Sequence, residues 1–320
     1  DDQEGAFATS TRSGGFIVSS QVNVSVDWIT TYGSGLTTYS LQTYVHEIGH
    51  ALGLGHAGNY NGSASWPGNA LYDNDSWSTT IMSYFDQTDN TFDPASYAYL
   101  ASVMTADAIA IQNLYGYAAT GLTTGNTVWG PGGNSGGALQ VLLNMWGGVT
   151  AVNPAIYAGN PLAFLINDDG GTDTMDFSVF SQDQQILLTA LARSDIAGLI
   201  DNVVIARNVV IENAKGGAGN DEIIGNTAGN KLEGNAGRDS ILGGAGNDQL
   251  YGGTGNDTLL GEVGNANFYG GTGNDSIDGG DGTDRYYYTG TSALTVNLSV
   301  TTAQNTGAGT GTDIIQNVEN

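Results

Sequence analysis

The chain has 320 residues, of which 32 are acidic and only 7 are Lys or Arg, so its formal net charge is −25 at pH 7. Nucleic acids and anionic membranes are bound through basic patches, and this charge balance argues against both as partners. Disulfides are excluded because there is no cysteine, and no apolar run is long enough to indicate a transmembrane helix.

Residues 40–52 are predicted to form a helix that ends before Gly53, a residue suited to positive φ. Apolar residues recur there at steps of four, three and four, and we expect them to form one stripe facing a core. The stripe consists of Leu41, Val45, Ile48 and Leu52. His46 and His50 are four residues apart and lie one above the other on the opposite face.

All three histidines of the chain, His46, His50 and His56, fall in the segment HEIGHALGLGH. Three imidazoles predict a zinc ion with a fourth position left for water, which is typical of a catalytic rather than a structural site. Glu47 lies one step around the helix, where it can reach that water without binding the metal, so it is the predicted general base. The alternatives are ordinary histidines and a structural zinc, and the absence of cysteine disfavours the second.

This motif, followed by TTIMSYF at residues 79–85, resembles the metzincin metalloproteases, and the Ser83-Tyr84 pair is similar to their serralysin branch. The resemblance implies that Met82 lies in a turn below the metal. It also implies that Tyr84 is a further, displaceable zinc ligand that stabilises the developing oxyanion. Residues 6–9 would line the substrate, and a second strand is expected at residues 22–28.

Only 45 residues precede His46, fewer than the resemblance leads us to expect. Three explanations stay open: an N-terminal fragment of the same protease binds here, the segment lies outside this chain, or the domain is reduced. Residues 105–115 are predicted to form a helix with Thr105 as its N-cap and Gly116 just past its end. A zinc metalloprotease domain is therefore expected at residues 1–116.

Residues 117–320 are expected to form a β-sandwich followed by a calcium-binding parallel β-roll. Residues 117–215 are rich in short strand-like runs and poor in helix signals. By the resemblance, two segments there jointly bind a calcium ion; an acidic surface loop is the alternative. The matching positions are Thr123, Gly125, Thr127, Asp168, Gly170 and Asp173.

A nine-residue period runs through residues 216–287 and matches the calcium-binding nonapeptide of RTX proteins. The first six residues of each unit form a turn, and the last three form a short strand whose middle residue points inward. A Gly/Asn-rich disordered linker, the alternative, would not keep these inward positions apolar. They are Ile223, Leu232, Ile241, Leu250, Leu259, Phe268, Ile277 and Tyr286.

Two units complete one coil, so calcium is predicted between turns eighteen residues apart. The first row of sixth-position residues is intact, whereas the second contains Asn230 and Ala266, which predicts weaker or missing sites there. The first row is Asp221, Asp239, Asp257 and Asp275, and the second has Asp248 and Asp284 as its carboxylates. Gly217 and Gly219 are further candidate calcium ligands. Whether Asn235 also supplies a ligand is left open. Without calcium, we expect the roll to be disordered.

The predicted fold is an α+β metzincin catalytic domain followed by an all-β C-terminal domain, a β-sandwich with a parallel β-roll. The predicted function is a secreted, bacterial zinc endopeptidase exported by a type I system, with one zinc ion and several structural calcium ions. Its partners would be protein or peptide substrates. Two alternatives stay open: a non-catalytic calcium-binding module with an inactive protease remnant, and a zinc hydrolase acting on other substrates.

The ending TDIIQNVEN is similar to VVIENAKGG at residues 209–217, and a second repeat block beyond Asn320 is a further hypothesis.

Overall fold

A computed structural model describes residues 5–116, 125–288, 296–307 and 311–320. The chain forms two compact units, each built from segments that are discontinuous in sequence, whereas the sequence predicts two consecutive domains. The first, the histidine unit, comprises Asp1–Gly121, Gly136–Asn167 and Leu199–Arg207. The second, the roll unit, comprises Leu122–Ser135, Asp168–Gly198 and Asn208–Asn320.

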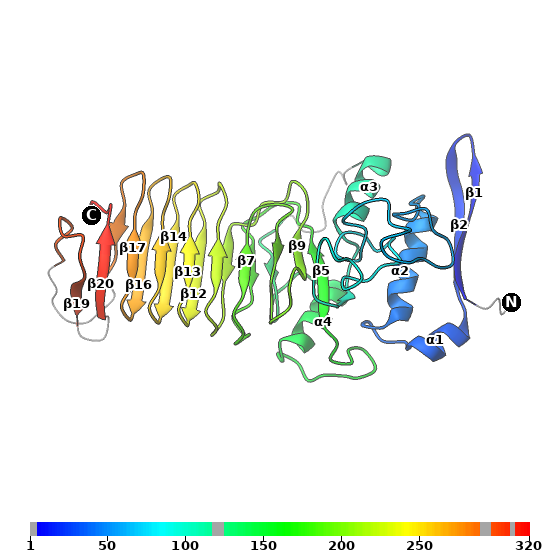
Figure 1. Ribbon diagram of the computed structural model, residues 1–320, viewed down its shortest axis with the longest axis horizontal. Helices are drawn as coiled ribbons and strands as arrows, with labels where there is room; N and C mark the ends of the chain where they lie inside the picture. The colour runs from blue at the N-terminus through cyan, green and yellow to red at the C-terminus, as the bar shows by residue number, and fades with distance from the viewer. Residues whose placement is uncertain (1–4, 117–124, 289–295, 308–310) are drawn as a thin grey trace. The chain divides into compact units, whose positions relative to one another are not determined.

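The histidine unit begins with an antiparallel hairpin of β1 (Ala6–Ser13) and β2 (Phe16–Val24), which is followed by helix α1 (Val26–Tyr32) (Figure 1). The expected strand at residues 6–9 lies within β1. The strand expected at residues 22–28 ends at Val24, because Ser25 Oγ accepts the Trp28 amide at 3.1 Å and caps α1. Trp28 is therefore helical, and that part of the prediction is wrong.

Helix α2 (Tyr39–Ala51) has Thr38 as its N-cap. It ends before Gly53, which has the positive φ (98°) expected of it. The apolar stripe does not face a core: Ile48 is 45% exposed, whereas Gln42, Glu47 and Gly49 are buried. The buried side faces a polar and crowded environment instead. Gln42 Oε1 accepts a hydrogen bond from the Leu100 amide, and the Met82 sulfur lies so close to Gly49 that a Cβ there would clash.

A parallel sheet with the order β3–β5–β9 lies in the same unit, together with helices α3 (Thr105–Tyr115) and α4 (Gly137–Trp146). Its strands are β3 (Tyr99–Leu100), β5 (Leu162–Ile166) and β9 (Val203–Ile205). Leu142, Met145, Tyr157 and Leu162 form a buried cluster that packs α4 against this sheet. Helix α4 lies in the region that the sequence analysis describes as poor in helix signals, and it was not predicted. The N-cap of α3 is Met104 rather than Thr105, which is the first helical residue.

The roll unit contains two seven-stranded sheets within its described residues, and their strands run side by side along the coil (Figure 1). The first sheet consists of β18 (Arg285–Tyr286), β16 (Asn267–Thr272), β14 (Gln249–Thr254), β12 (Lys231–Ala236), β10 (Asn213–Lys215), β6 (Thr174–Asp176) and β4 (Val128–Trp129). The second consists of β19 (Gln304–Gly307), β20 (Gly311–Gln316), β17 (Ser276–Asp278), β15 (Thr258–Leu260), β13 (Ser240–Leu242), β11 (Glu222–Ile224) and β7 (Gln185–Leu187). The short β8 (Arg193–Ser194) follows β7. In these two sheets β19 and β20 pair antiparallel, and the other neighbouring strands pair parallel.

The register of the roll confirms the predicted coil of eighteen residues. Leu232 pairs with Leu250 and Leu250 with Phe268, while Ile223 pairs with Ile241. Seven of the eight predicted inward residues are at most 1% exposed. The eighth, Tyr286, is only half-buried, because its hydroxyl turns to Asp313 Oδ2 at 3.0 Å. Stacked short strands with apolar middle residues thus give the roll a continuous thin core.

A ladder of aromatic rings runs along one face of the first sheet. The rings of Tyr251 and Tyr269 are 4.2 Å apart and nearly parallel, and those of Tyr269 and Tyr287 are 4.9 Å apart. The Lys231 ammonium lies 5.1 Å from the Tyr251 ring. Identical residues stack because parallel strands in eighteen-residue register place them at equivalent positions.

Candidate metal and catalytic site

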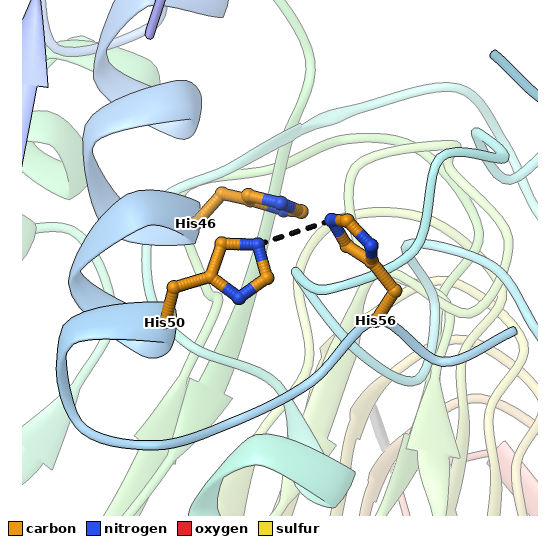
Figure 2. A group of neighbouring side chains, drawn as sticks. All are labelled: His46, His50 and His56. Atoms are coloured by element: carbon orange, nitrogen blue, oxygen red, sulfur yellow. Dashed lines mark hydrogen bonds between the residues drawn. The ribbon is translucent and has the colours of Figure 1, made fainter. Parts of the chain in front are cut away.

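The three histidines converge from one helix and the loop after it, as Figure 2 shows: His46 and His50 project from α2, and His56 faces them. Each offers a ring nitrogen, and these nitrogens all lie within 4.8 Å of one another. The ring centroids of His46 and His50 are 4.7 Å apart, and those of His50 and His56 are 4.6 Å apart. Among the described residues, this is the one group of three or more metal-ligating side chains.

Backbone carbonyls orient the rings. His46 Nδ1 lies 2.8 Å from the Ile81 carbonyl oxygen, and His50 Nδ1 lies 2.9 Å from that of Leu54. A ring nitrogen facing a carbonyl carries the proton, so each ring turns the lone pair of Nε2 inward. His50 Nε2 and His56 Nε2 are only 3.0 Å apart (Figure 2). Facing lone pairs at that distance fit a shared cation, and three neutral imidazoles suit zinc.

The surroundings favour the neutral form of the His46 and His56 rings. Burial lowers the pKa of His46 to about 4; the bond to Ile81 opposes this shift, and His50 and His56 add to it. Burial likewise lowers the pKa of His56, with a further contribution from His50, against a hydrogen bond to the Tyr60 backbone. Because metals bind the unprotonated ring, these shifts favour metal binding at neutral pH.

Glu47 is 7% exposed and lines the same cavity as His46 and Tyr84. Burial raises the pKa of Glu47, while His50 and a hydrogen bond from the Ala8 backbone lower it. A carboxylate with a raised pKa beside a metal site is well suited to exchange a proton with a reacting group.

The cavity beside Glu47 has a volume of about 480 Å³ and an aromatic wall. The Trp28 and Tyr39 rings are 5.9 Å apart, and the Tyr39 and Trp77 rings are 6.1 Å apart. A cavity of this size, with an aromatic wall and polar groups beside a proton-transferring side chain, is typical of a substrate site.

Tyr84 lies next to the histidines, where the sequence places it. Its ring centroid is 4.6 Å from that of His56 and 5.9 Å from that of His46. Its hydroxyl accepts a hydrogen bond from the Gly62 amide at 3.5 Å. The buried Met82 lies against Gly49 of α2, so the predicted methionine turn does pack against the helix that carries His46 and His50.

The predicted calcium-binding carboxylates form two rows in the roll unit. In each row, Oδ1 of one aspartate accepts the amide of the residue eighteen positions earlier, as in Asp221 N to Asp239 Oδ1 at 2.8 Å. The second oxygen of five of these aspartates is buried and has no hydrogen-bond partner among the described residues. They are Asp239, Asp248, Asp257, Asp275 and Asp284.

The turns place further oxygens beside these carboxylates. A Cβ on Gly243 would lie 2.6 Å from Asp248 Oδ2 and 3.0 Å from the Gly261 carbonyl oxygen, so only glycine leaves room between them. Unpartnered carboxylate oxygens next to carbonyl oxygens are the ligands calcium prefers. In the second row, Asn230 Oδ1 accepts the Asn226 amide, and Ala266 offers no side-chain oxygen. Asn235, whose role as a ligand the sequence leaves open, donates a hydrogen bond from its side-chain amide to the Gly216 carbonyl.

Five of the residues proposed for the other calcium ion meet in the roll unit. The Thr127 amide donates to Asp173 Oδ1 at 2.7 Å, and its hydroxyl donates to the Gly125 carbonyl at 3.1 Å. Asp168 Oδ1 accepts the Gly170 amide, and Asp173 Oδ2 is buried without a partner among the described residues. Thr123 lies outside the described residues.

Comparisons with known proteins agree with this geometry. The family model described as Peptidase M10 serralysin C terminal matches residues 152–316, just over half of the chain. The chain belongs to the serralysin family. The family model described as Metallo-peptidase family M12B Reprolysin-like matches residues 7–109 of this serralysin-family chain, which include the histidine motif. The resemblance and the fold class predicted from the sequence are thereby confirmed.

Curated relatives cover the same ground. The Metallopeptidase AprA of Pseudomonas marginalis is 41% identical over 202 residues, which are 62% of this chain and 39% of that protein. The Serralysin of Proteus mirabilis is 43% identical over 199 residues, 62% of this chain and 38% of the relative. The Serralysin of Photorhabdus luminescens is 42% identical over 198 residues, which are 61% of this chain and 38% of that protein. The chain thus spans about two fifths of the length of the relatives it matches.

Two residues that support the serralysin site escaped the sequence analysis. Asp107 of α3 accepts hydrogen bonds from the Thr80 hydroxyl and the Ile81 and Met104 amides, and so ties the methionine turn to α3. An acidic residue in the first helical turn was the available signal. The Tyr60 ring lies 5.5 Å from His56 and 4.8 Å from Tyr84. Nothing in the sequence distinguishes Tyr60 from the other fifteen of its sixteen tyrosines.

Proposed function

We propose that this chain carries the zinc centre and the calcium-binding roll of a secreted endopeptidase. The observation that carries this proposal is the meeting of three inward-facing imidazole nitrogens with Glu47 and Tyr84 at one cavity. His46, His50 and His56 would hold the zinc ion, with Tyr84 as a further ligand. Family membership supports peptide hydrolysis as the reaction.

The side chains have distinct tasks in this reaction. A bound zinc ion would polarise the scissile carbonyl and make a water molecule acidic near neutral pH. Glu47 would accept the proton from that water and pass it to the leaving amine, which its buried position and raised pKa favour. The Tyr84 hydroxyl would donate a hydrogen bond to the developing oxyanion. The aromatic wall of Trp28, Tyr39 and Trp77 would hold a substrate side chain.

Substitution of the general base tests this function. We expect Glu47→Ala to retain one zinc per chain while casein hydrolysis falls by at least about 10²-fold, since the proton acceptor is lost. Asp27→Ala, which removes an exposed carboxylate elsewhere in the histidine unit, is the matched control. Retained turnover in Glu47→Ala with zinc bound would falsify the assignment.

Calcium is proposed as the second cofactor, bound along the roll by the two aspartate rows. The five unpartnered buried oxygens support this, as does the repulsion that their negative charges would otherwise cause. Three ions are expected on the intact first row and fewer on the second. A further ion is proposed for Gly125, Thr127, Asp168, Gly170 and Asp173, together with Thr123. Elemental analysis that finds zinc but no calcium in folded protein would exclude this role.

The hairpin of the histidine unit is the proposed contact surface for an N-terminal segment of the same protease. Phe16 is 76% exposed, Val18 is 60% exposed, and Ile48 of α2 is 45% exposed. A two-stranded sheet with exposed apolar side chains is stabilised when a further strand or segment covers it. Hydrogen exchange should show β2 amides more strongly protected in protein purified from its native source than in this chain alone. Equal exchange would contradict the proposal.

Extracellular location by type I export is proposed from the roll, because a roll that is unstable at neutral pH without calcium can cross a channel unfolded. None of the helices in the described part of the chain has the length and apolar character needed to span a bilayer. Detection of the intact protein in cell-free medium, and its loss when the export channel is inactivated, would test this.

A non-catalytic calcium module is the second candidate, favoured by the exposed hairpin. A casein assay with and without a zinc chelator separates the two.

A further inference from the structure

Tyr60 is buried between two residues of the proposed zinc centre. Its ring centroid lies 5.5 Å from that of His56 and 4.8 Å from that of Tyr84, at interplanar angles of 31° and 36°. The residue is 6% exposed, and its backbone forms a hydrogen bond with the His56 ring. The tasks proposed for the histidines, Glu47 and Tyr84 make no use of Tyr60. Its place nevertheless limits where both neighbouring rings can lie, because packed rings cannot interpenetrate.

A buried carboxylate fixes the Tyr60 ring at its tip. The hydroxyl donates to Asp75 Oδ1 at 2.9 Å, and Asp75 is 2% exposed. Hydrogen bonds to a carboxylate are stronger than those between neutral groups, and at a buried position no water takes over when the bond breaks. The Phe85 ring lies edge-on to that of Tyr60 with centroids 5.4 Å apart, and a Cβ on Gly58 would clash with the Tyr60 ring. The ring is therefore held by a hydrogen bond and by close packing on its flanks.

The bond between Tyr60 and Asp75 joins two segments of the histidine unit. Tyr60 lies four residues after His56, in the segment that follows this histidine. Asp75 lies at the start of the segment that leads through the methionine turn to Tyr84. The Tyr84 backbone also hydrogen bonds to the Tyr60 hydroxyl. One side chain thus links the segment that carries His56 to the segment that carries Tyr84.

Ring packing rather than hydrogen bonding holds the Tyr84 side chain. Its hydroxyl accepts the Gly62 amide at 3.5 Å, a distance at which such a bond is weak. Its ring packs against those of Tyr60 and His56, with centroids 4.8 and 4.6 Å away. Aromatic rings in contact at these distances stabilise one another's orientation. The place of the Tyr84 phenol therefore depends on Tyr60, which is itself fixed.

We propose that Tyr60, held by Asp75, is the positioning residue for Tyr84. It keeps the Tyr84 phenol beside His56, where its hydroxyl would serve the metal and the developing oxyanion. The inference rests on the proposed function, in which Tyr84 is a displaceable zinc ligand. A misplaced group that acts mainly on the transition state lowers kcat and leaves KM nearly unaltered. Loss of Tyr60 should therefore resemble loss of the Tyr84 hydroxyl, although Tyr60 does not line the cavity beside Glu47.

The direct test is the visible spectrum of the Cu(II)-substituted protein, which needs no substrate. A tyrosine bound to Cu(II) has a charge-transfer band in the visible, and Tyr84→Phe identifies the band of this site by its loss. We expect the band to fall to about half or less in Tyr60→Leu, which removes the ring, and less steeply in Tyr60→Phe, which removes only the hydroxyl. Tyr72→Phe, at an exposed tyrosine, is the control. A band of parental strength in Tyr60→Leu overturns the proposal.

Kinetics provide the second readout. In the zinc-loaded protein, kcat for casein should fall about tenfold in Tyr60→Leu, with KM changed less than about twofold. Tyr60→Phe and Asp75→Ala break the same hydrogen bond, so the double variant should lose little more activity than the more damaging single variant. Asp73→Ala, which removes an exposed carboxylate two residues before Asp75, is the matched control. Effects that multiply in the double variant contradict the role of Asp75.

The outcomes separate this inference from the proposed function. If Tyr60→Leu does not fold, the band in Tyr60→Phe decides by the same criterion. A Tyr84 band that depends on Tyr60, in protein that does not hydrolyse casein, supports the positioning role and contradicts the peptidase. Casein hydrolysis that requires Tyr84 but is equal in the parent protein and the Tyr60 variants contradicts the positioning role alone. A parent protein without the band overturns the inference together with the Tyr84 ligand.

Discussion

The amide of Asp275 donates a hydrogen bond of 2.9 Å to Oδ1 of Asp313, thirty-eight residues further along the chain. In the earlier part of this row the same bond joins residues eighteen apart, as in Asp239 to Asp257. Ile277 of β17 also pairs with Ile315 of β20 in parallel register. The roll therefore resumes its register after an insertion, and β20 adds a strand that lies outside the repeat block.

Asp313→Ala should destabilise this end of the roll. The substitution leaves the buried amide of Asp275 without its acceptor, and the expected loss is about 1–3 kcal/mol in the free energy of unfolding. Calcium-dependent denaturation, with hydrogen exchange read at residues 275–278, measures it. Asp281→Ala, which removes an exposed carboxylate, is the control. Identical stability of the two variants would show that β20 does not support the coil.

Ala266→Asp should complete the second aspartate row. Ala266 is 2% exposed and donates its amide to Asp284 Oδ1 at 2.7 Å, so its backbone already has the geometry of the row. A carboxylate there would supply the missing calcium ligand. We expect one or two more calcium ions per chain by calorimetric titration and a higher melting temperature only when calcium is present. Ala266→Asn serves as control, and an unchanged calcium count in Ala266→Asp contradicts the proposed row.

The calcium-free roll should lose stability as the pH rises. Burial raises the pKa of Asp239 and of Asp275 to about 7, and that of Asp221 to about 6, from an ordinary value of 3.8. The folded roll then binds more protons than the unfolded chain between pH 3.8 and about 7. Its stabilising protons are in place below that window and are lost as the pH rises through it.

Bound calcium reverses this dependence, because it holds the same carboxylates in their ionised form. Calorimetric melting with a calcium chelator should show a melting temperature that falls across the window, and melting with calcium should show one that rises. A chelated sample whose stability rose with pH would refute the assignment of these buried carboxylates.

The metal-free histidine unit should show the opposite pH dependence. Burial lowers the pKa of His46 from 6.5 to about 4, so between these values the unfolded chain binds the extra proton. The contribution to stability is complete above pH 6.5 and is lost as the pH falls toward 4, with a slope of at most about 1.4 kcal/mol per pH unit. Tryptophan fluorescence during urea unfolding measures it. His46→Gln should flatten the slope; an unaltered slope would point to another group.

Asp107→Ala should loosen the methionine turn. The substitution leaves the Thr80 hydroxyl and the Ile81 and Met104 amides without their acceptor. We expect a loss of about 3 kcal/mol in stability and weaker zinc binding, because the Ile81 carbonyl orients His46. Zinc affinity by competition with a chelating dye measures the second effect. Asp89→Ala, on an exposed loop, is the comparison, and zinc affinity equal to that of the original chain would argue against this anchoring role.

Features that depend on residues close together in the sequence were predicted correctly, because the interactions that form them lie within a short segment. The four-residue spacing of His46 and His50 and the helix stop at Gly53 depend on one helical turn. The nine-residue period sets the register of the roll because each coil contacts only its neighbours. That the histidines meet at a single point follows from the same short segment.

Other features depend on contacts that a local pattern does not encode. The burial of Gln42 and the exposure of Ile48 follow from what α2 packs against, so the apolar stripe was misleading. The bond between Thr80 and Asp107 spans 27 residues, and that between Tyr60 and Asp75 spans 15. Neither pair has a residue spacing from which the contact could be predicted.

The sequence similarity between residues 209–217 and the end of the chain has a structural basis. Glu212 Oε2 accepts the Asp173 amide at 2.7 Å, and Glu319 Oε2 accepts the Asp284 amide at 2.8 Å. The two glutamates thus occupy equivalent positions in the coil. The insertion before β20 hides this equivalence from a search for a constant period.

The stacked rings of Tyr251, Tyr269 and Tyr287 supply the roll with an intrinsic optical probe. Aromatic chromophores 4.2 and 4.9 Å apart, with interplanar angles of 5° and 10°, couple their electronic transitions when the coil is wound. Unwinding separates them. Near-ultraviolet circular dichroism at tyrosine wavelengths can therefore follow the winding of this part of the coil, with no attached dye, as the part of the signal that is lost on substitution of Tyr269.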